Sequence, residues 1–381
     1  MYDIEARLAR IRGDATPRNH NARTIAALTS NPGCARRAVL DAAGVDKQRL
    51  AAHLGFPASP GQSQFAIGRG NAFEAQVKAN GCAELLRLLR EHLGLAIPEA
   101  FYDNLDEVAG NAGTEVRHAR TRSLFARAAA SGSDAGTLFD HPLLRLEVGG
   151  RGVYLEPYLI AFQLQGQFHV VEIKSFSVID GQADGEKVAA AVVQSAVYVL
   201  ALRNLLGELG IAPEAVADRV VLICPENFSN KPTAAQLDVR RQLTVLRRQL
   251  ARLEAIGTLV ASLPAELTFD LALDKRGMPR RPSGEVTGAV SLVEARYAPE
   301  CLASCEMAFF CRDEAAGCTA ALGRAVREDL GGVEHTSTVI RLARGQLGHD
   351  DAQAEAAEVL RRAARLRAEC AAPHLIAQEA G

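Results

Sequence analysis

The stretch FHVVEIKSFSV, residues 168–178, decides the fold class, because it has the composition of a buried β-strand and carries two charges. Glu172 and Lys174 are two positions apart, so on a strand both side chains leave the same face. Val171 and Ile173 alternate with them and leave the opposite face, toward a core. A carboxylate and an ammonium group on an apolar strand are costly to bury unless they are solvated or serve a function.

The segments around this strand form an α/β pattern. The expected elements are helices at 68–81 and 83–95, strands at 143–150, 152–163 and 168–178, a helix at 187–210 and a strand at 218–225. Gln165 and Gly166, between the second and third strands, favour a β-hairpin. The succession predicts a mixed central sheet flanked by helices.

Composition is that of a globular protein with a core. The chain has 381 residues, of which 48% are apolar and 23% charged, and a net charge of −2. A nucleic-acid enzyme with this charge needs a local basic groove. The N-terminal residues lack an apolar signal segment, and the richest apolar run, 189–202, reads as a buried helix. We therefore expect a cytoplasmic protein without a membrane partner.

Glu156 lies on the strand expected before 168–178, so across the hairpin it would bring a second carboxylate to Glu172. Two carboxylates and the backbone carbonyl of Ile173 suit Mg²⁺ or Mn²⁺. Such a metal would polarise a phosphate and activate a water, and Lys174 would orient that water or offset developing charge. The alternative is an ordinary Glu/Lys pair on an amphipathic edge hairpin.

The helix expected at 187–210 carries two polar residues that packing does not explain. Gln194 and Tyr198 are four apart on one face of a helix that is otherwise rich in Val, Ala and Leu. We expect both to face the strand that carries Lys174. Upstream, Glu74 follows Gly70 near the start of the first helix and offers another carboxylate.

Together these motifs resemble a known family. They occur in the order Gly70-x₃-Glu74, Glu156, Glu172-x-Lys174, Gln194-x₃-Tyr198. This arrangement, over roughly residues 70–224, resembles the RecB-type nucleases of the PD-(D/E)XK superfamily, which include the nuclease domains of RecB and AddB and the CRISPR-associated iron–sulfur exonucleases. The resemblance implies a restriction-endonuclease-like core.

The resemblance also implies roles for the site residues. The metal ligands would be Glu74, Glu156, Glu172 and the Ile173 carbonyl, and Lys174 would be the catalytic lysine. Gln194 and Tyr198 would steady either the scissile strand or this lysine. The family usually has Asp in place of Glu156 and often His in place of Glu74, which leaves an altered or lost activity open. Asp140 and Glu147 are less favoured stand-ins for Glu156.

Four cysteines lie within eighteen residues near the C-terminal end: Cys301, Cys305, Cys311 and Cys318. In a reducing compartment this density favours metal binding over buried thiols, and the spacing alone does not choose zinc or iron–sulfur. Cys82, Cys224 and Cys370 stand singly in apolar surroundings, so we expect them in the core.

Iron–sulfur nucleases of this type carry one cysteine far upstream and three in a C-terminal group. By this resemblance a [4Fe–4S] cluster would be held by Cys34, Cys301, Cys305 and Cys311, with Cys318 as a spare that could replace Cys34 or Cys301. The cluster would join the helical N- and C-terminal regions. The expected organisation is a helical region at 1–65, a nuclease core at 66–230, a helical extension at 231–284 and a cysteine-rich, helical region at 285–381.

The leading hypothesis is a Mg²⁺- or Mn²⁺-dependent deoxyribonuclease, an exonuclease on single strands or DNA ends in DNA repair or phage defence, working with a helicase or other defence or repair proteins. The arginine-rich segment 238–260 is either a solvated amphipathic helix or a DNA-contacting face. A rival function is that of a non-catalytic DNA-end-binding or scaffold subunit with the same fold. A third is a zinc-stabilised interaction protein. A phosphate-binding loop of the helicase type is absent from the sequence.

Overall fold

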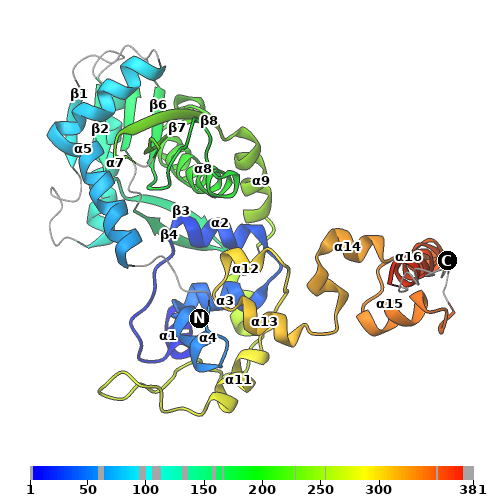
Figure 1. The fold of residues 1–381 in the computed structure, drawn as a ribbon. Coiled ribbons are helices and arrows are strands. Elements are labelled where there is room, and N and C mark those ends of the chain that lie inside the picture. Colours follow the sequence, from blue (N-terminus) through cyan, green and yellow to red (C-terminus); the bar gives the residue numbers. More distant parts are fainter. Residues whose placement is uncertain are drawn as a thin grey trace, which may run out of the picture. The chain divides into compact units, whose positions relative to one another are not determined.

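The fold comes from a computed structural model that describes residues 3–58, 64–93, 100–104, 113–130, 136–156, 160–164, 167–227, 229–253, 255–348 and 351–371. The chain divides into two compact units (Figure 1). The first unit comprises residues 1–46 and 59–293, and the second comprises residues 47–58 and 294–381.

The first unit contains the strands. They are β1 (Ala100–Asn104), β2 (Gly136–Asp140), β3 (Leu144–Val148), β4 (Arg151–Leu155), β5 (Ile160–Leu164), β6 (Gln167–Ile173), β7 (Arg219–Pro225) and β8 (Pro232–Asp238). Its α-helices are α1 (Ile4–Arg12), α2 (Ala22–Ser30), α3 (Ala35–Ala43), α5 (Gln64–Leu93), α7 (Thr114–Ala130), α8 (Gly185–Glu208), α9 (Arg240–Leu250), α10 (Ile256–Ala261) and α11 (Ser283–Ser291). The class is mixed α/β, as expected from the sequence.

The central sheet has six strands in the order β1-β2-β5-β6-β7-β8. Strands β2, β5 and β6 form an antiparallel meander, and β6 then pairs in parallel with β7. The long helix α8 makes the crossover between those two parallel strands, as a parallel pair requires. The C-terminal ends of β2, β6 and β7 therefore meet at one edge of the sheet.

Helices α5 and α8 cover opposite faces of this sheet. One core cluster joins Phe73, Val77 and Leu85 of α5 to Val171 of β6 and to β7. A second cluster joins Ala191 of α8 to Leu222 and Cys224 of β7, whose side chains leave the face of the sheet opposite α5. The sheet is thus the middle layer of three, and each polar residue at its edge faces either the α5 layer or the α8 layer.

Several predicted elements are confirmed. The two helical segments at 68–95 form α5, which is broken at 79–82 by non-helical backbone. Leu164 pairs with Gln167, so β5 and β6 form the expected hairpin, although Gln165 and Gly166 themselves lie outside the described residues. The apolar run 189–202 lies within α8, a mostly buried core helix that is also the one helix among the described residues long and apolar enough to span a membrane.

The expected single strand at 152–163 is wrong. Residues 151–155 form β4, which pairs with β3 in a separate two-stranded sheet, and residues 160–164 form β5 in the central sheet. Pro157 lies between the two strands, outside the described residues. Alternation of residue types cannot show that a strand changes partners, because both halves of such a strand have the same period.

The expected helix at 238–260 is also divided. Its first residue ends β8, the residues from Arg240 to Leu250 form α9, and a turn near residue 252 separates α9 from α10. Strands β1, β2 and β8 were not expected from the sequence. The edge strand β8 alternates weakly and includes polar residues, so its sequence carries little strand signal.

The second unit is helical. It contains α4 (Lys47–His53), α12 (Cys301–Ser304), α13 (Ala308–Glu314), α14 (Arg324–Asp329), α15 (Thr336–Ala343) and α16 (Ala354–Ala371). The ring of Phe56, just after α4, packs edge-on against Phe310 of α13 at a centroid distance of 5.6 Å. Lys47 and Glu306 form an ion pair of 3.6 Å. A segment from the N-terminal part of the chain therefore packs within the cysteine-rich unit.

Candidate active site

The centre of the candidate site is Lys174, at the C-terminal end of β6. Its Nζ lies 2.6 Å from a carboxylate oxygen of Glu172 and donates a hydrogen bond of 2.7 Å to the side-chain oxygen of Gln194. The sequence-based expectation that Glu172 and Lys174 share a face, and that Gln194 of α8 faces them, is confirmed. Tyr198 lies one helical turn after Gln194 on α8 and is partly buried.

Burial makes Glu172 unusual. Only 6% of the residue is exposed. Burial raises the pKa of Glu172, the nearby ammonium of Lys174 acts in the opposite direction, and the carboxylate of Glu74 raises this pKa further. Val171 and Ile173 direct their side chains toward the α5 layer, so Glu172 points toward the other face of the sheet. Glu74 of α5 nevertheless lies close enough to affect the pKa of Glu172.

Helix α5 approaches the end of β6 closely through Gly70. A Cβ atom at Gly70 would lie 3.5 Å from the hydroxyl of Ser175, so this position of the helix faces the residue after Lys174 at ordinary van der Waals distance. Arg69 donates hydrogen bonds of 3.1 Å to the Ser175 carbonyl and 3.3 Å to the Ser177 hydroxyl. These contacts place the start of α5 beside the residues that follow Lys174.

A second polar group, the α5-side group, consists of Glu74, Lys78, Asp140 and His141. The side chain of Lys78 is only 10% exposed, and its Nζ lies 2.6 Å from Asp140, contacts Glu74 and lies 3.4 Å from His141 Nε2. Burial alone would lower the pKa of Lys78, but the ion pairs with Asp140 and Glu74 outweigh it and raise this pKa.

Sequence reasoning did not single out Lys78 or His141, and it ranked Asp140 below Glu156. The signal for Lys78 was present, because Glu74 and Lys78 are four residues apart on a helix and can pair. The pairing with Asp140 could not be read from the sequence, since it depends on β2, which was not expected. Asp140 is level with Val171, two strands away in the sheet.

Glu156 does not lie across a hairpin from Glu172, and this expectation is corrected. It follows β4 of the small sheet, and Arg117 of α7 donates hydrogen bonds of 2.7 and 3.1 Å to its carboxylate. The hydrogen bond from Arg117 lowers the pKa of Glu156. Its side chain is 42% exposed. Strand β4 belongs to the two-stranded sheet and β6 to the central sheet, so no strand pairing brings Glu156 opposite Glu172.

A metal ion would need donors that converge. Within the residues that the structure describes, no group of three or more His, Cys, Asp or Glu side chains is arranged to hold one. The carboxylates of Glu74, Asp140 and Glu172 are hard oxygen donors of the kind that Mg²⁺ prefers. In this conformation, however, each is paired with a lysine ammonium. The donors fit a divalent cation in kind, and the present arrangement does not form its cage.

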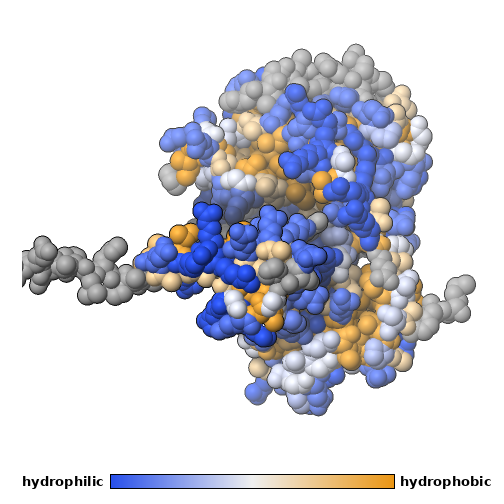
Figure 2. Space-filling view, turned by 90° about the vertical axis from the view of Figure 1, so that its right-hand side faces the viewer, coloured by the Kyte–Doolittle hydropathy of each residue, from blue (hydrophilic) through white to orange (hydrophobic). Residues whose placement is uncertain are grey.

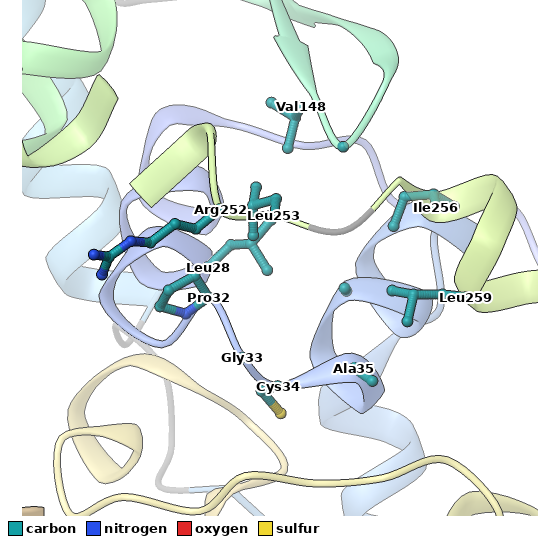
Figure 3. Close-up of a pocket in the computed structure, with 12 residues that line it drawn as sticks. Leu28, Pro32, Gly33, Cys34, Ala35, Val148, Arg252, Leu253, Ile256 and Leu259 are labelled. Carbon is teal, nitrogen blue, oxygen red and sulfur yellow. The ribbon is translucent and has the colours of Figure 1, made fainter. Parts of the chain in front are cut away.

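The cysteines fall into three environments. Cys34 precedes α3 and lines a cavity of about 140 Å³, whose other lining residues are mostly apolar and include Arg252. Figure 3 shows its sulfur directed away from the other side chains around this cavity. Cys82 and Cys224 lie in the core as expected, and burial raises the pKa of each thiol to about 12.

The remaining cysteines belong to the second unit. Cys301 begins α12, Cys305 follows it, and Cys311 lies in α13. Burial raises the pKa of Tyr297, Arg312 lowers it, and Cys301 and Cys311 raise it, so both thiols lie within electrostatic reach of one phenol. Cys318 forms a backbone bridge with His335. Cys370 is exposed on α16, so its expected place in the core is wrong. It lies on a face of this helix whose neighbouring residues are also exposed, and a few apolar residues next to it in the sequence do not bury it.

No model of a known protein family matches the chain, and no curated protein matches it.

Proposed function

We propose that the protein is a divalent-metal-dependent deoxyribonuclease whose reacting phosphate binds at Lys174. The observation that carries the proposal is the contact of Lys174 with both Glu172 and Gln194, which come from β6 and α8. The meander β2-β5-β6 followed by a helical crossover to β7 supports a PD-(D/E)XK core. In this proposal the site hydrolyses a phosphodiester bond at DNA ends or in single strands.

The roles of the chain's own residues follow from their chemistry. Lys174 offers an ammonium group that offsets negative charge on the phosphate, and Gln194 holds that ammonium in place. Glu172 holds the lysine from the sheet side through its ion pair of 2.6 Å. Glu172 also offers, beside Lys174, a hard carboxylate oxygen of the kind that a divalent cation prefers. Bound Mg²⁺ or Mn²⁺ would supply an activated water and polarise the phosphate.

DNA would also need a basic surface, since the net charge is −2. Helix α9 offers one: it buries Leu243 and Leu246 and exposes four arginines, without an acidic residue in the helix. Those arginines are Arg240, Arg241, Arg247 and Arg248. Figure 2 turns this side of the first unit toward the viewer and shows strongly hydrophilic side chains over it. Affinity that depends on such arginines falls steeply with added salt.

The test is cleavage of end-labelled single- and double-stranded DNA with Mn²⁺, with Mg²⁺ and with EDTA. Glu172→Gln and Lys174→Met should each reduce cleavage by at least about 1,000-fold, because both act on the reacting phosphate. Lys187→Met is the matched control, since Lys187 is exposed at the start of α8 and pairs with Asp184. Cleavage at the wild-type rate by the Lys174 variant would remove this active site.

A second candidate function is a non-catalytic DNA-end-binding or scaffold subunit. Two observations favour it: Lys78 occupies the space between Glu74 and Asp140, and Glu156 pairs with Arg117 instead of joining Glu172. Salt-sensitive binding of DNA ends by wild-type protein, with no cleavage under either metal, would select this function. Binding that is absent at low salt would exclude both candidates.

The resemblance further leads us to propose a [4Fe–4S] cluster on Cys34, Cys301, Cys305 and Cys311. Soft thiolates suit iron–sulfur clusters, and none of these four is held in the core as deeply as Cys82 or Cys224. Cys34 belongs to the first unit and the other three to the second.

A further inference from the structure

We propose that Lys78 is a built-in cation that occupies a divalent-metal site formed by Glu74, Asp140 and His141. The inference deepens the proposed nuclease function, because it states which part of the acidic edge is closed to metal. It concerns only the α5-side group and not the Lys174 group on the opposite face of the sheet.

The geometry around the Lys78 ammonium is that of a bound cation. Its Nζ lies 2.6 Å from Asp140 Oδ1, contacts Glu74 Oε1 and lies 3.4 Å from His141 Nε2. Two carboxylates and an imidazole are a usual ligand set for Mn²⁺ or Zn²⁺. The three donors come from α5, from the last residue of β2 and from the residue after it, so separate elements of the fold converge on one ammonium group.

Burial of the carboxylates makes this ammonium stabilising. The Asp140 side chain is 3% exposed and that of Glu74 is 18% exposed. Two carboxylates at this depth repel each other, and water does little to screen them. A cation between them offsets this repulsion, and the chain supplies one covalently. A fixed ammonium cannot be removed by a chelator, unlike a metal ion.

The break in α5 protects the position of Lys78. Helical geometry ends at Ala79, and the following residues, Asn80 to Cys82, have left-handed backbone. Cys82, which is fully buried, feels the charges of Asp140 and Lys78. The ammonium is thus enclosed by the core on one side and by the three donors on the other.

The consequence for function is that a divalent ion bound by the wild-type protein does not use the Glu74–Asp140 pair. Wild-type protein should bind at most one Mn²⁺ per chain, and Asp140→Asn should leave that number unchanged. Lys78→Met, which keeps the length of the side chain and removes the charge, should add one Mn²⁺ per chain. The measurement is isothermal titration with Mn²⁺ combined with Mn²⁺ electron paramagnetic resonance, on the full-length protein.

Stability offers a second measurement in case the variant folds poorly. In EDTA, Lys78→Met should melt at a lower temperature than wild type, because its two carboxylates lack a cation. Mn²⁺ should restore much of the loss in this variant and have a smaller effect on wild type. The double change Lys78→Met/Asp140→Asn removes one positive and one negative charge, so it should bind no added Mn²⁺ and should gain little stability from it.

The outcomes separate this inference from the nuclease proposal. An unchanged Mn²⁺ number in Lys78→Met, or a wild-type Mn²⁺ site that Asp140→Asn abolishes, would overturn the role of Lys78. A gained Mn²⁺ site in Lys78→Met supports it even when wild-type protein cuts no DNA. Cleavage that depends on Lys174, without any gain of metal in the Lys78 variant, would keep the nuclease proposal and reject this one.

Discussion

Lys174 is held by one charged and one neutral partner, and this difference decides what each contributes. Glu172 lies 2.6 Å away and balances the charge, whereas Gln194 accepts a hydrogen bond of 2.7 Å and sets direction. Because Gln194 comes from α8 and Lys174 from the end of β6, their contact ties the helix to the sheet edge. A neutral acceptor can orient the ammonium without lowering its net charge.

Removal of that acceptor should impair turnover more than binding. A hydrogen bond to a charged group is worth ~1.5–3 kcal/mol, so Gln194→Ala should reduce kcat by roughly 10- to 100-fold. Gln194→Glu keeps an acceptor and should retain more of the rate. Single-turnover cleavage separates kcat from KM. An unaltered kcat in the alanine variant would show that Gln194 does not position the lysine.

Glu156 and Arg117 form a pair that is partly open to solvent, with side chains 42% and 17% exposed. Exposed ion pairs contribute little, so Glu156→Gln and Arg117→Met should each lower the free energy of unfolding by about 1 kcal/mol or less. Urea unfolding of the two variants and of the double variant measures their coupling. Loss of cleavage in Glu156→Gln at normal stability, without loss in Arg117→Met, would instead make Glu156 the metal ligand that the family resemblance implies.

At the scale of elements, the break in α5 is the feature that sets the α5-side group. Asn80, Gly81 and Cys82 have φ values of 54°, 64° and 65°, in the left-handed region. The segment from Gly70 to Lys78 can therefore approach Ser175 and Asp140, while the segment from Ala83 onward packs Leu85, Leu88 and Leu89 into the core.

Gly81 offers a clean test of this break. A Cβ at Gly81 would meet no atom within 4 Å, so Gly81→Ala changes only the backbone preference. The left-handed conformation costs a residue with a Cβ roughly 1–2 kcal/mol, and the free energy of unfolding should fall by about that amount. Asn80→Gly is the control and should leave stability equal or higher. Equal stability of Gly81→Ala and wild type in urea would mean that the helix is continuous in solution.

At the scale of the whole molecule, the cysteines provide the prediction that needs only purified protein. Protein made without oxygen should be brown and contain iron and sulfide in near-equal amounts. Cys34→Ser should remove the colour and lower the melting temperature, whereas Cys82→Ala and Cys224→Ala should keep the colour, since both thiols are buried in the core. Cys318→Ser should keep it as well.

A colourless protein with one zinc ion, unaffected by Cys34→Ser, would contradict the iron–sulfur cluster. It would indicate a local site of Cys301, Cys305, Cys311 and Cys318, all of which lie within the second unit. The nuclease proposal would then rest on the Lys174 group alone.

The sequence by itself determined the elements whose pattern is local. Alternation around Glu172 and Lys174 predicted β6 and its two faces, the apolar run predicted α8, and the glycine after Gln165 predicted the hairpin. Gln194 was correctly placed toward Lys174, because a polar residue in an apolar helix has few stable surroundings. Each of these inferences depends on residues close together in the chain.

Only the tertiary structure decided which carboxylates meet. Glu156 was expected beside Glu172 on grounds of order, but its strand pairs with β3 and its charge is taken by Arg117. Asp140 joins Lys78 across 62 residues, through a strand that the sequence did not reveal. Ion pairs form between whichever charges the packed layers bring within a few ångströms, and the packing of layers depends on the whole core, which no local pattern specifies.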